Sequence, residues 1–378
     1  IRPENQPFAQ GPSGGKRGAE MHPDVPDKPV EDLREFFQET SATLFDTVQF
    51  DGWLAFGMFT ASLAAKEVHR RWKAFPGLWF HGAPQEGKSS LARWLMRILG
   101  FTVDTGIAVD SSTLPGMQIA MQQYGNLPVW FEEFQSDTDK SRQNLLKLFF
   151  DRTSGGKMSS TKYGRRVLGC PVVTGVATSN SDQLRSRYAH VLVSATRRRE
   201  NHFEWFQANS GDFFHFGRFV LQRRPQFVKR VLELLDEWSG LEELRATEPR
   251  AKLVYGTAYA GFTALAEMLE AHAPSRIAEF RRHLISRTIE SARKVIDQGD
   301  VNVFWTDLLA SWRAGAFGFT APELSRYFKV KSVACKHAPG APHQTTDARG
   351  QKWQSHTLYL AMGGLLPDRK STRLNSSH

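Results

Sequence analysis

The stretch GLWFHGAPQEGKSSLARWLMRILG, residues 77–100, contains three consecutive local patterns that decide the fold. Leu78 to His81 is a short apolar run, which is typical of a buried strand. A glycine-rich loop follows, and from Ser89 the apolar side chains recur at helical spacing until Gly100. A buried strand that leads through such a loop into an amphipathic helix predicts an α/β fold.

The loop from Gly82 to Ser89 fits Gly-x4-Gly-Lys-Ser, the Walker A pattern. Glycines let successive N–H groups curl around phosphate oxygens, and the helix presents its positive N-terminal end. We expect Lys88 to reach the β- and γ-phosphates of ATP and the Ser89 hydroxyl to bind Mg2+. A chain of this length meets the pattern by chance on the order of once in 100; the alternative is an ordinary turn with a surface lysine. The predicted nucleotide-binding residues are Gly82, Ala83, Pro84, Gln85, Glu86, Gly87, Lys88, Ser89 and Ser90.

Two carboxylates stand at the end of the next apolar run. Leu127 to Phe131 reads as a strand, and Glu132 and Glu133 follow it, 44 residues after Lys88. A nucleotide hydrolase needs one carboxylate to orient Mg2+ and often a second to position the attacking water. We assign Glu132 to the metal and Glu133 to the water. The reverse assignment stays open because Glu replaces the usual Asp, and a solvated strand end is the alternative to both.

A polar segment follows the apolar strand predicted at Val172–Ala177. In a parallel sheet, Thr178, Ser179 and Asn180 would lie beside the two acids, where one of them can orient water against the γ-phosphate. We assign this role, called sensor 1, to Asn180, with Thr178 or Ser179 as alternatives. An Asn that only shapes a turn is the other interpretation.

Two arginines precede the strand predicted at Val191–Ser194. In a ring of subunits, Arg187 or Arg185 can reach the γ-phosphate of a neighbour, with Arg187 as the first choice. Such an arginine contributes about 10^3–10^5 in rate, or roughly 4–7 kcal/mol of barrier. Salt bridges within one subunit are the alternative.

The positive charge of the chain is concentrated in one stretch. The chain has 49 basic and 39 acidic residues, a net charge of +10 and a pI near 9.6. Between Arg152 and Arg199 there are ten Lys or Arg residues and one acid, Asp182, so this stretch alone carries +9. Such a concentration favours a polyanionic partner.

Cysteine content and hydropathy exclude several classes of protein. Cys170 and Cys335 cannot build a disulfide framework, and Cys335 with His337 and His343 lacks a fourth metal ligand. No apolar run reaches the ~18 residues that span a bilayer, and no signal peptide is visible. We therefore expect no membrane association and a cytoplasmic location.

The predicted elements divide the chain into six segments. They are a disordered linker at 1–30, an N-terminal helical segment at 31–75, a P-loop core at 76–200, a helical lid at 201–300, a small C-terminal domain at 301–366, and a non-native or disordered tail at 367–378. Two helices are expected between Val30 and Phe75, the second capped by Asp51. The C-terminal domain is compatible with a winged helix, with a helix from Thr320 and a strand at Trp353–Leu360. Because the chain begins at Ile1, we expect further sequence upstream.

The motifs together resemble the AAA+ P-loop ATPases, and more closely the helicase portion of phage and plasmid primase-helicases, a superfamily-three-like group. The matching stretches are FPGLWFHGAPQEGKSSLARWL, NLPVWFEEF, VVTGVATSN and LRSRYAHVLV, which span about 76–194. The resemblance implies an α/β P-loop NTPase core with a parallel sheet, N-terminal helices, a helical lid and a small C-terminal domain. It also implies a homo-oligomeric ring, usually a hexamer, that moves a DNA strand through its pore.

The family places a β-hairpin with a basic tip before the sensor strand. Residues 153–166 occupy that position, with glycines for a turn and Tyr163 as a stacking ring. A solvated basic loop is the alternative. The predicted nucleic-acid contacts are Lys157, Lys162, Arg165 and Arg166.

The leading functional hypothesis is an ATP-hydrolysing motor that depends on single-stranded nucleic acid, a replicative DNA helicase of a phage or mobile element. One alternative is a P-loop ATPase that acts as a loader, transposition regulator or signalling switch without unwinding. A nucleic-acid-binding scaffold with a degenerate ATP site is a third, and the intact Lys88, Ser89 and acid pair argue against it.

Overall fold

The computed structural model divides the chain into two compact units, residues 1–298 and 299–378. In the first unit the described residues are 27–297 without 103–104, 124–125, 136–137, 153–168, 195–199 and 272. In the second they are 328–332, 345–346, 352–353, 356–360 and 372–373. The linker predicted at 1–30 therefore lies almost wholly outside the described residues.

The first unit is built on a five-stranded sheet in which every strand runs parallel to its neighbours. The strands are β1 (Gly77–His81), β2 (Ile107–Ala108), β3 (Pro128–Phe134), β4 (Cys170–Gly175) and β5 (Tyr188–Leu192). Their order is β2-β3-β4-β1-β5, so β4 lies between β1 and β3. This sheet, with helices packed on it, confirms the predicted α/β class. The sequence pattern missed β2, because two residues are too few to show a period.

Apolar side chains at alternate strand positions fill a separate core on each face of the sheet. Trp79, Phe131 and Val173 pack on one face with α5 (Leu114–Gln123) and α6 (Lys140–Asp151). Leu78 and Trp130 pack on the other face with α4 (Lys88–Met96) and most of the remaining helices. Because both faces are covered, the strands read as continuous apolar runs rather than as alternating ones.

Of the remaining helices in the described chain, three precede β1 in the sequence, one lies between β4 and β5, and the others follow β5. They are α1 (Val30–Val48), α2 (Phe50–Ala61), α3 (Ala65–Trp72), α7 (Asp182–Arg185), α8 (Glu200–Asn209), α9 (Phe214–Gln222), α10 (Arg224–Ser239), α11 (Pro249–Met268) and α12 (Pro274–Asp297). Short 3-10 turns occupy Ser62–Ala64, Arg97–Leu99, Ser210–Phe213 and Glu242–Leu244. No helix in the described part of the chain is long and apolar enough to cross a membrane.

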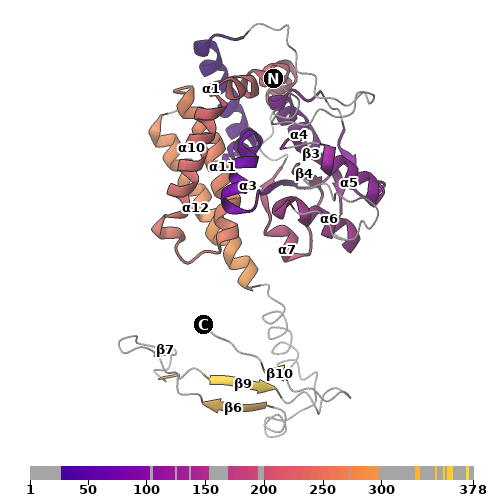
Figure 1. Ribbon diagram of the computed structural model, residues 1–378, viewed down its shortest axis with the longest axis vertical. Coiled ribbons are helices and arrows are strands. Elements are labelled where there is room, and N and C mark those ends of the chain that lie inside the picture. The colour runs from indigo at the N-terminus through magenta and orange to yellow at the C-terminus, as the bar shows by residue number, and fades with distance from the viewer. Residues whose placement is uncertain are drawn as a thin grey trace. The chain divides into compact units, whose positions relative to one another are not determined.

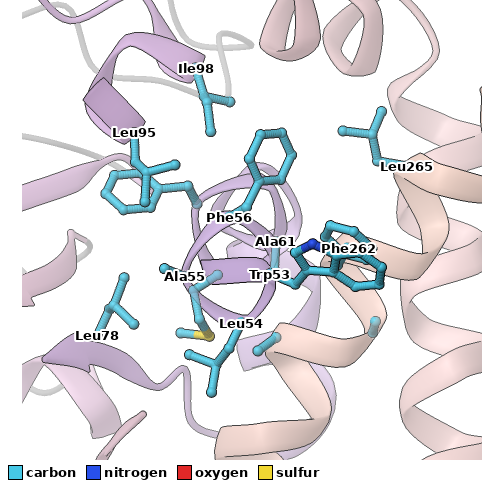
Figure 2. Close-up of a cluster of buried hydrophobic side chains, with 14 of the residues drawn as sticks. Trp53, Leu54, Ala55, Phe56, Ala61, Leu78, Leu95, Ile98, Phe262 and Leu265 are labelled. Carbon is cyan, nitrogen blue, oxygen red and sulfur yellow. The ribbon is translucent and has the colours of Figure 1, made fainter. Parts of the chain in front are cut away.

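The N-terminal helices and the late helices share one apolar core, on the side of the sheet away from α5 and α6 (Figure 1). Trp53 of α2 stacks on Phe262 of α11 with ring centroids 4.5 Å apart (Figure 2). Phe37 of α1 meets the same Phe262 ring at 5.4 Å, and Phe280 of α12 meets it at 5.3 Å. Segments about 200 residues apart in the sequence therefore pack as a single bundle.

The start of α2 corrects one expectation. Asp51 is not its cap, because the helix begins at Phe50 with Gln49 at the N-cap position. The buried Asp51 carboxylate instead accepts a hydrogen bond from the Leu192 N–H (3.4 Å) and pairs with Arg287 of α12 (3.5 Å). Asp51 thus connects α2, β5 and α12, which the local sequence pattern could not relate. The part of the chain between Val30 and Phe75 contains three α-helices, where the sequence predicted two.

The second unit contains short antiparallel strands. β6 (Phe328–Ser332), β9 (His356–Leu360) and β10 (Thr372–Arg373) form one sheet in the order β10-β9-β6, and β7 (Thr345–Thr346) pairs with β8 (Lys352–Trp353). The strand predicted at Trp353–Leu360 corresponds to the end of β8 and to β9. The helix expected from Thr320 lies outside the described residues, as do Cys335, His337 and His343.

Candidate functional site

The carboxyl ends of β1, β4 and β3 lie side by side at one edge of the sheet. The register pairs Phe80 of β1 with Thr174 of β4, and Val173 of β4 with Phe131 of β3. Since parallel strands all end at the same edge, the segments that follow them leave the sheet together. At this edge lie the glycine-rich loop after β1, the acid pair in the last three residues of β3, and the polar stretch at 178–180 after β4. A hydrogen bond from the Gly82 N–H to the Val176 carbonyl (3.4 Å) joins the first to the third.

The glycine-rich loop connects β1 directly to α4. Gly82 has φ 151, and a β-carbon there would stand well under 3.0 Å from the Val193 carbonyl oxygen, so no other residue fits without a shift of backbone. Gly87 has φ 91 and forms the left-handed N-cap of α4, which begins at Lys88. The unbonded N–H groups of the first turn of α4 therefore lie at the edge where the strands end.

Lys88 lies across this loop. Its ammonium donates to the carbonyl oxygens of Gly82 (2.9 Å) and Ala83. Burial lowers the pKa of Lys88, and the nearby Glu86 carboxylate opposes that shift. Glu86 itself accepts a hydrogen bond from the Ala83 N–H (2.7 Å), which braces the loop from within. Because both hydrogen-bond acceptors of Lys88 are neutral carbonyls, its positive charge remains available to an anion.

Ser89 and Glu132 supply the kind of oxygen donors that Mg2+ takes. Ser89 is in the first turn of α4. Glu132 has the same strand parity as Trp130, which packs in the core under α4, so it lies toward the α4 face of the sheet. A hydroxyl and one carboxylate suit Mg2+, which usually combines one or two protein oxygens with substrate phosphates and water. In the described chain no cluster of three or more His, Cys, Asp or Glu could hold a metal on its own.

Glu133 lies on an irregularity of β3. The pairing of β3 with β4 shifts register between Phe131 and Phe134, and Glu133 adopts φ 60. A left-handed backbone at a residue other than glycine costs of order 1 kcal/mol or more, and bulges of this kind gather at functional sites. In a regular strand Glu132 and Glu133 would point to opposite faces. The bulge releases the exposed Glu133 from that alternation.

The polar stretch after β4 separates into buried and exposed residues. Ser179 is 1% exposed, and its hydroxyl donates to Gln143 Oε1 (2.9 Å) and accepts from the Ser181 N–H (3.0 Å). The hydroxyl of Ser179 is therefore already engaged. Asn180 is exposed and Thr178 is half-buried, so these two side chains face solvent at the edge where the strands end.

Arg187 lies at the opposite edge of the sheet. Its carbonyl accepts from the N–H of Gly77, the first residue of β1 (3.1 Å), so it is about 16 Å of strand away from the glycine-rich loop that starts at Gly82. Its guanidinium pairs with Asp151 at 3.6 Å and lies over the Phe150 ring at 5.7 Å. Burial lowers the pKa of Arg187, and the nearby Arg250 acts in the same direction. Arg187 cannot serve the loop of its own subunit from this position.

Arg185 ends the short helix α7 and pairs with Asp182 within that helix. Its carbonyl oxygen is also a hydrogen-bond partner of the His190 ring, at 3.0 Å from Nε2. The Arg185 side chain is thus held locally, beside the start of β5.

The predicted nucleic-acid residues Lys157, Lys162, Arg165 and Arg166 lie outside the described residues, but the two ends of their segment are described. The chain leaves α6 at Arg152 and enters β4 at Cys170. Arg152 is 4% exposed, and its guanidinium bonds Asn126 Oδ1 (2.7 Å) and Cys170 Sγ (3.7 Å). Burial raises the pKa of the Cys170 thiol to about 11, with Arg152 opposing the shift. Both ends of the basic segment are therefore fixed at the edge where Arg187 lies.

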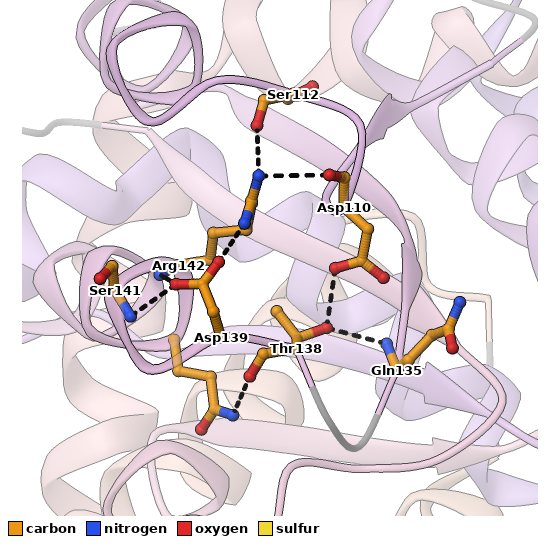
Figure 3. Close-up of polar contacts among 8 residues, drawn as sticks. Asp110, Ser112, Gln135, Thr138, Asp139, Ser141 and Arg142 are labelled. Carbon is orange, nitrogen blue, oxygen red and sulfur yellow. Dashed lines mark hydrogen bonds and ion pairs between the residues drawn. The ribbon is translucent and has the colours of Figure 1, made fainter.

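A hydrogen-bonded cluster beside the acid pair was not predicted. Asp110, Ser112, Thr138, Asp139 and Arg142 connect the segments after β2 and β3 to the start of α6 (Figure 3). Gln143 extends the cluster to Ser179. No sequence signal marks these residues, because each is an ordinary polar residue near a helix start. Only the fold brings them together.

The chain matches no protein-family model and no curated protein. Among solved structures, its fold is similar to that of the SCCmec type IV Cch active helicase, with a TM-score of 0.55 and 13% identity. That match covers 78% of this chain and 59% of the Cch chain, so this chain spans less than two thirds of that helicase. The X-ray structure of the JCV helicase matches with a TM-score of 0.25 and 13% identity, over 68% of this chain and 71% of that one. The second similarity is too weak to support an argument, and the first shows a helicase-like fold.

Proposed function

We propose that this chain is an ATP-hydrolysing, nucleic-acid-dependent motor, a replicative DNA helicase of a phage or mobile element. The observation that carries the proposal is the strand order β3-β4-β1, because it sets the segments of Glu132, Asn180 and Lys88 on adjacent strand ends. The fold similarity to the Cch helicase supports the assignment to helicases.

In the proposed reaction the loop binds the phosphates of ATP. The N–H groups of the first turn of α4 donate to phosphate oxygens, and the helix dipole favours their negative charge. Lys88 exchanges its two carbonyl partners for the β- and γ-phosphates. That exchange is favourable because a charge-assisted hydrogen bond to phosphate is stronger than one to a neutral carbonyl.

The hydroxyl of Ser89 and the carboxylate of Glu132 would hold the magnesium ion. When bound, the ion would supply positive charge that offsets the negative charge developing on the phosphate oxygens. Glu132 would hold the ion from the α4 face of the sheet. Glu133, which the bulge releases from the regular strand alternation, accepts a hydrogen bond from the attacking water. That hydrogen bond directs a lone pair of the water oxygen toward the γ-phosphorus.

Two further side chains complete the proposed site. Asn180 orients the same water from the adjacent β4 segment. Arg187 of a neighbouring subunit contacts the γ-phosphate, since its position at the far edge of the sheet suits a contact between subunits better than one within a subunit. A closed ring, such as a hexamer, gives every site such a neighbour.

The proposed partner is single-stranded nucleic acid, with DNA favoured. The stretch 152–199 carries +9 of the net charge of +10, which suits a phosphate backbone. Lys157, Lys162, Arg165 and Arg166 are the proposed contacts. Their segment starts and ends at the edge of the sheet opposite the nucleotide site, so it can bind a strand while ATP occupies the loop.

Steady-state ATPase assays with and without single-stranded DNA test the proposal. The wild type should hydrolyse ATP faster with DNA, and Lys88→Ala should lose both hydrolysis and tight ATP binding. Wild-type turnover in Lys88→Ala would overturn the assignment of the site. Replacing Lys157 and Lys162 together by Ala should abolish DNA stimulation and flatten the salt slope of binding by roughly 1.4–1.8 units.

A strand-displacement assay separates the proposed helicase from a loader or switch. A helicase unwinds a tailed duplex in the presence of ATP and Mg2+, and Lys88→Ala provides the inactive control. DNA-stimulated hydrolysis without unwinding would favour the loader, transposition regulator or signalling switch instead.

A further inference from the structure

Gln143 connects two segments of the proposed site through the two ends of its amide. It lies in the first turn of α6, and its side chain is half-buried. Its Nε2 donates to the Thr138 carbonyl oxygen (2.6 Å), and its Oε1 accepts from the Ser179 hydroxyl (2.9 Å). One side chain therefore spans the gap between the segment after β3 and the segment after β4.

The partner on the β3 side is held firmly. Thr138 is 5% exposed, its hydroxyl donates to Asp110 Oδ1 (3.1 Å), and it accepts from the Gln135 N–H (3.1 Å) (Figure 3). Gln135 is two residues beyond Glu133. The position of the Thr138 carbonyl is thus tied to the bulge that carries Glu133.

The partner on the β4 side is held equally well. Ser179 is buried, and its hydroxyl also accepts from the Ser181 N–H (3.0 Å). The residue between them is Asn180. Because the Ser179 hydroxyl also holds the Ser181 N–H, its hydrogen bond to the Gln143 amide restrains the backbone on both sides of Asn180.

The helix that carries Gln143 is itself fixed at this end. Asp139 caps α6 by accepting from the N–H groups of Ser141 (2.8 Å) and Arg142 (3.0 Å). Arg142 donates to the carbonyl oxygens of Asp110 (3.2 Å) and Ser112 (3.0 Å), in the segment after β2 (Figure 3). The Gln143 side chain therefore extends from a helix start that several hydrogen bonds hold in place.

We infer that Gln143 is a positioning residue for hydrolysis, which sets the distance between Glu133 and Asn180 so that both can address one water molecule. The inference rests on the proposed function. Among the described residues the Gln143 side chain bonds Thr138 and Ser179 and not the glycine-rich loop or Lys88, so its role is in the chemical step and not in nucleotide binding. A displacement of about 1 Å at a reacting group can cost on the order of 100-fold in rate.

The test compares Gln143→Ala, Gln143→Glu and Ser179→Ala with a matched control, Asn144→Ala. Asn144 is the next residue of α6, is exposed, and its Oδ1 accepts a hydrogen bond from Lys147 of the same helix (3.2 Å). In steady-state ATPase assays, Gln143→Ala should lower kcat by roughly 10- to 100-fold and leave KM within about threefold. Gln143→Glu should do the same, because a carboxylate accepts from Ser179 but cannot donate to the Thr138 carbonyl.

A double variant gives a second readout. If Gln143 and Ser179 act through one bridge, Gln143→Ala with Ser179→Ala should lose no more activity than the more damaged single variant. Thermal unfolding of each variant shows whether the loss of kcat exceeds what a general loss of folding explains.

The outcomes separate this inference from the proposed function. A kcat for Gln143→Ala within twofold of an active wild type overturns the inference alone. Equal losses in kcat and nucleotide affinity, together with a fall in Tm, also overturn it, since they indicate a merely structural bond. If the wild type and Asn144→Ala both fail to hydrolyse ATP, the proposed function fails and the inference fails with it.

Discussion

The carbonyl oxygen of Phe134 lies against the α-carbon of Gly175, where a β-carbon would stand. The distance to such a β-carbon is well under 3.0 Å, and the obstacle is backbone, which cannot swing aside. Phe134 follows the bulge of β3, and Gly175 is the last residue of β4. The close approach of these two strands therefore depends on a residue without a side chain.

Gly175→Ala should push the β3 bulge away from β4 and disturb Glu133 more than the phosphate loop. We expect a loss of stability of about 1–3 kcal/mol, measured by denaturant unfolding, and a fall in kcat larger than the change in nucleotide affinity. Gly240→Ala is the matched control, because a β-carbon there has its nearest atoms at 3.5 and 3.7 Å and the backbone has φ −85. Equal effects of the two substitutions would contradict this account of the bulge.

Glu133→Gln should bind ATP and hydrolyse it about 10^2–10^4-fold more slowly, because the metal ligands remain while the water loses its carboxylate. Glu132→Gln should weaken Mg2+-dependent nucleotide binding instead. Equilibrium binding of a fluorescent ATP analogue, with and without Mg2+, distinguishes the two variants. If Glu132→Gln binds normally without turnover and Glu133→Gln is the one that fails to bind, the two roles are reversed.

Arg187→Ala should lose ATPase activity although its side chain is far from the loop of its own subunit. Mixing Arg187→Ala subunits with Lys88→Ala subunits should restore part of that activity, because a mixed ring contains sites with both residues intact. Sedimentation with ATP and DNA reports the assembly state. A fully active monomer would rule out a site shared between subunits, and the pair with Asp151 would then explain Arg187 as a local salt bridge.

The buried His190 ring should make the stability of the fold depend on pH. Burial lowers its pKa from the ordinary 6.5 to about 3, and His81, Arg287 and Arg185 act in the same direction, while the hydrogen bond to the Arg185 carbonyl opposes the shift. Its Nδ1 is buried and has no hydrogen-bond partner among the described residues. Between pH 6.5 and 3 the unfolded chain binds more protons at this site than the folded chain, so acidification destabilises the fold.

The slope from this single group is at most about 1.4 kcal/mol per pH unit. His190→Gln cannot take up that proton, so its stability should fall less steeply than that of the wild type as the pH is lowered from 6.5 toward 4. Denaturant unfolding at several pH values measures the difference. Parallel curves for the two proteins would show that His190 is free to ionise in the folded state.

The local patterns of the sequence anticipated the strand β1, the glycine-rich loop, the helix α4 and the α/β class. Each of these depends on residues close together in the chain. Gly82, Gly87 and Lys88 are close enough in sequence to belong to a single loop of backbone. The apolar run of β1 is continuous because helices cover both faces of the sheet. The acid pair is equally local in sequence, although β3 does not end before it as the pattern predicted but continues through Glu132 and Glu133 to Phe134.

The tertiary structure decided how these pieces meet. The strand order that inserts β4 between β1 and β3, the bulge at Glu133 and the position of Arg187 at the far edge all depend on strand register, which no local pattern specifies. Asp51 shows the same limit, because its partners Leu192 and Arg287 are more than 100 residues away. Gln143 and Ser179 are 36 residues apart, and a glutamine in a helix has no distinguishing feature until the fold places a hydroxyl 2.9 Å from its amide.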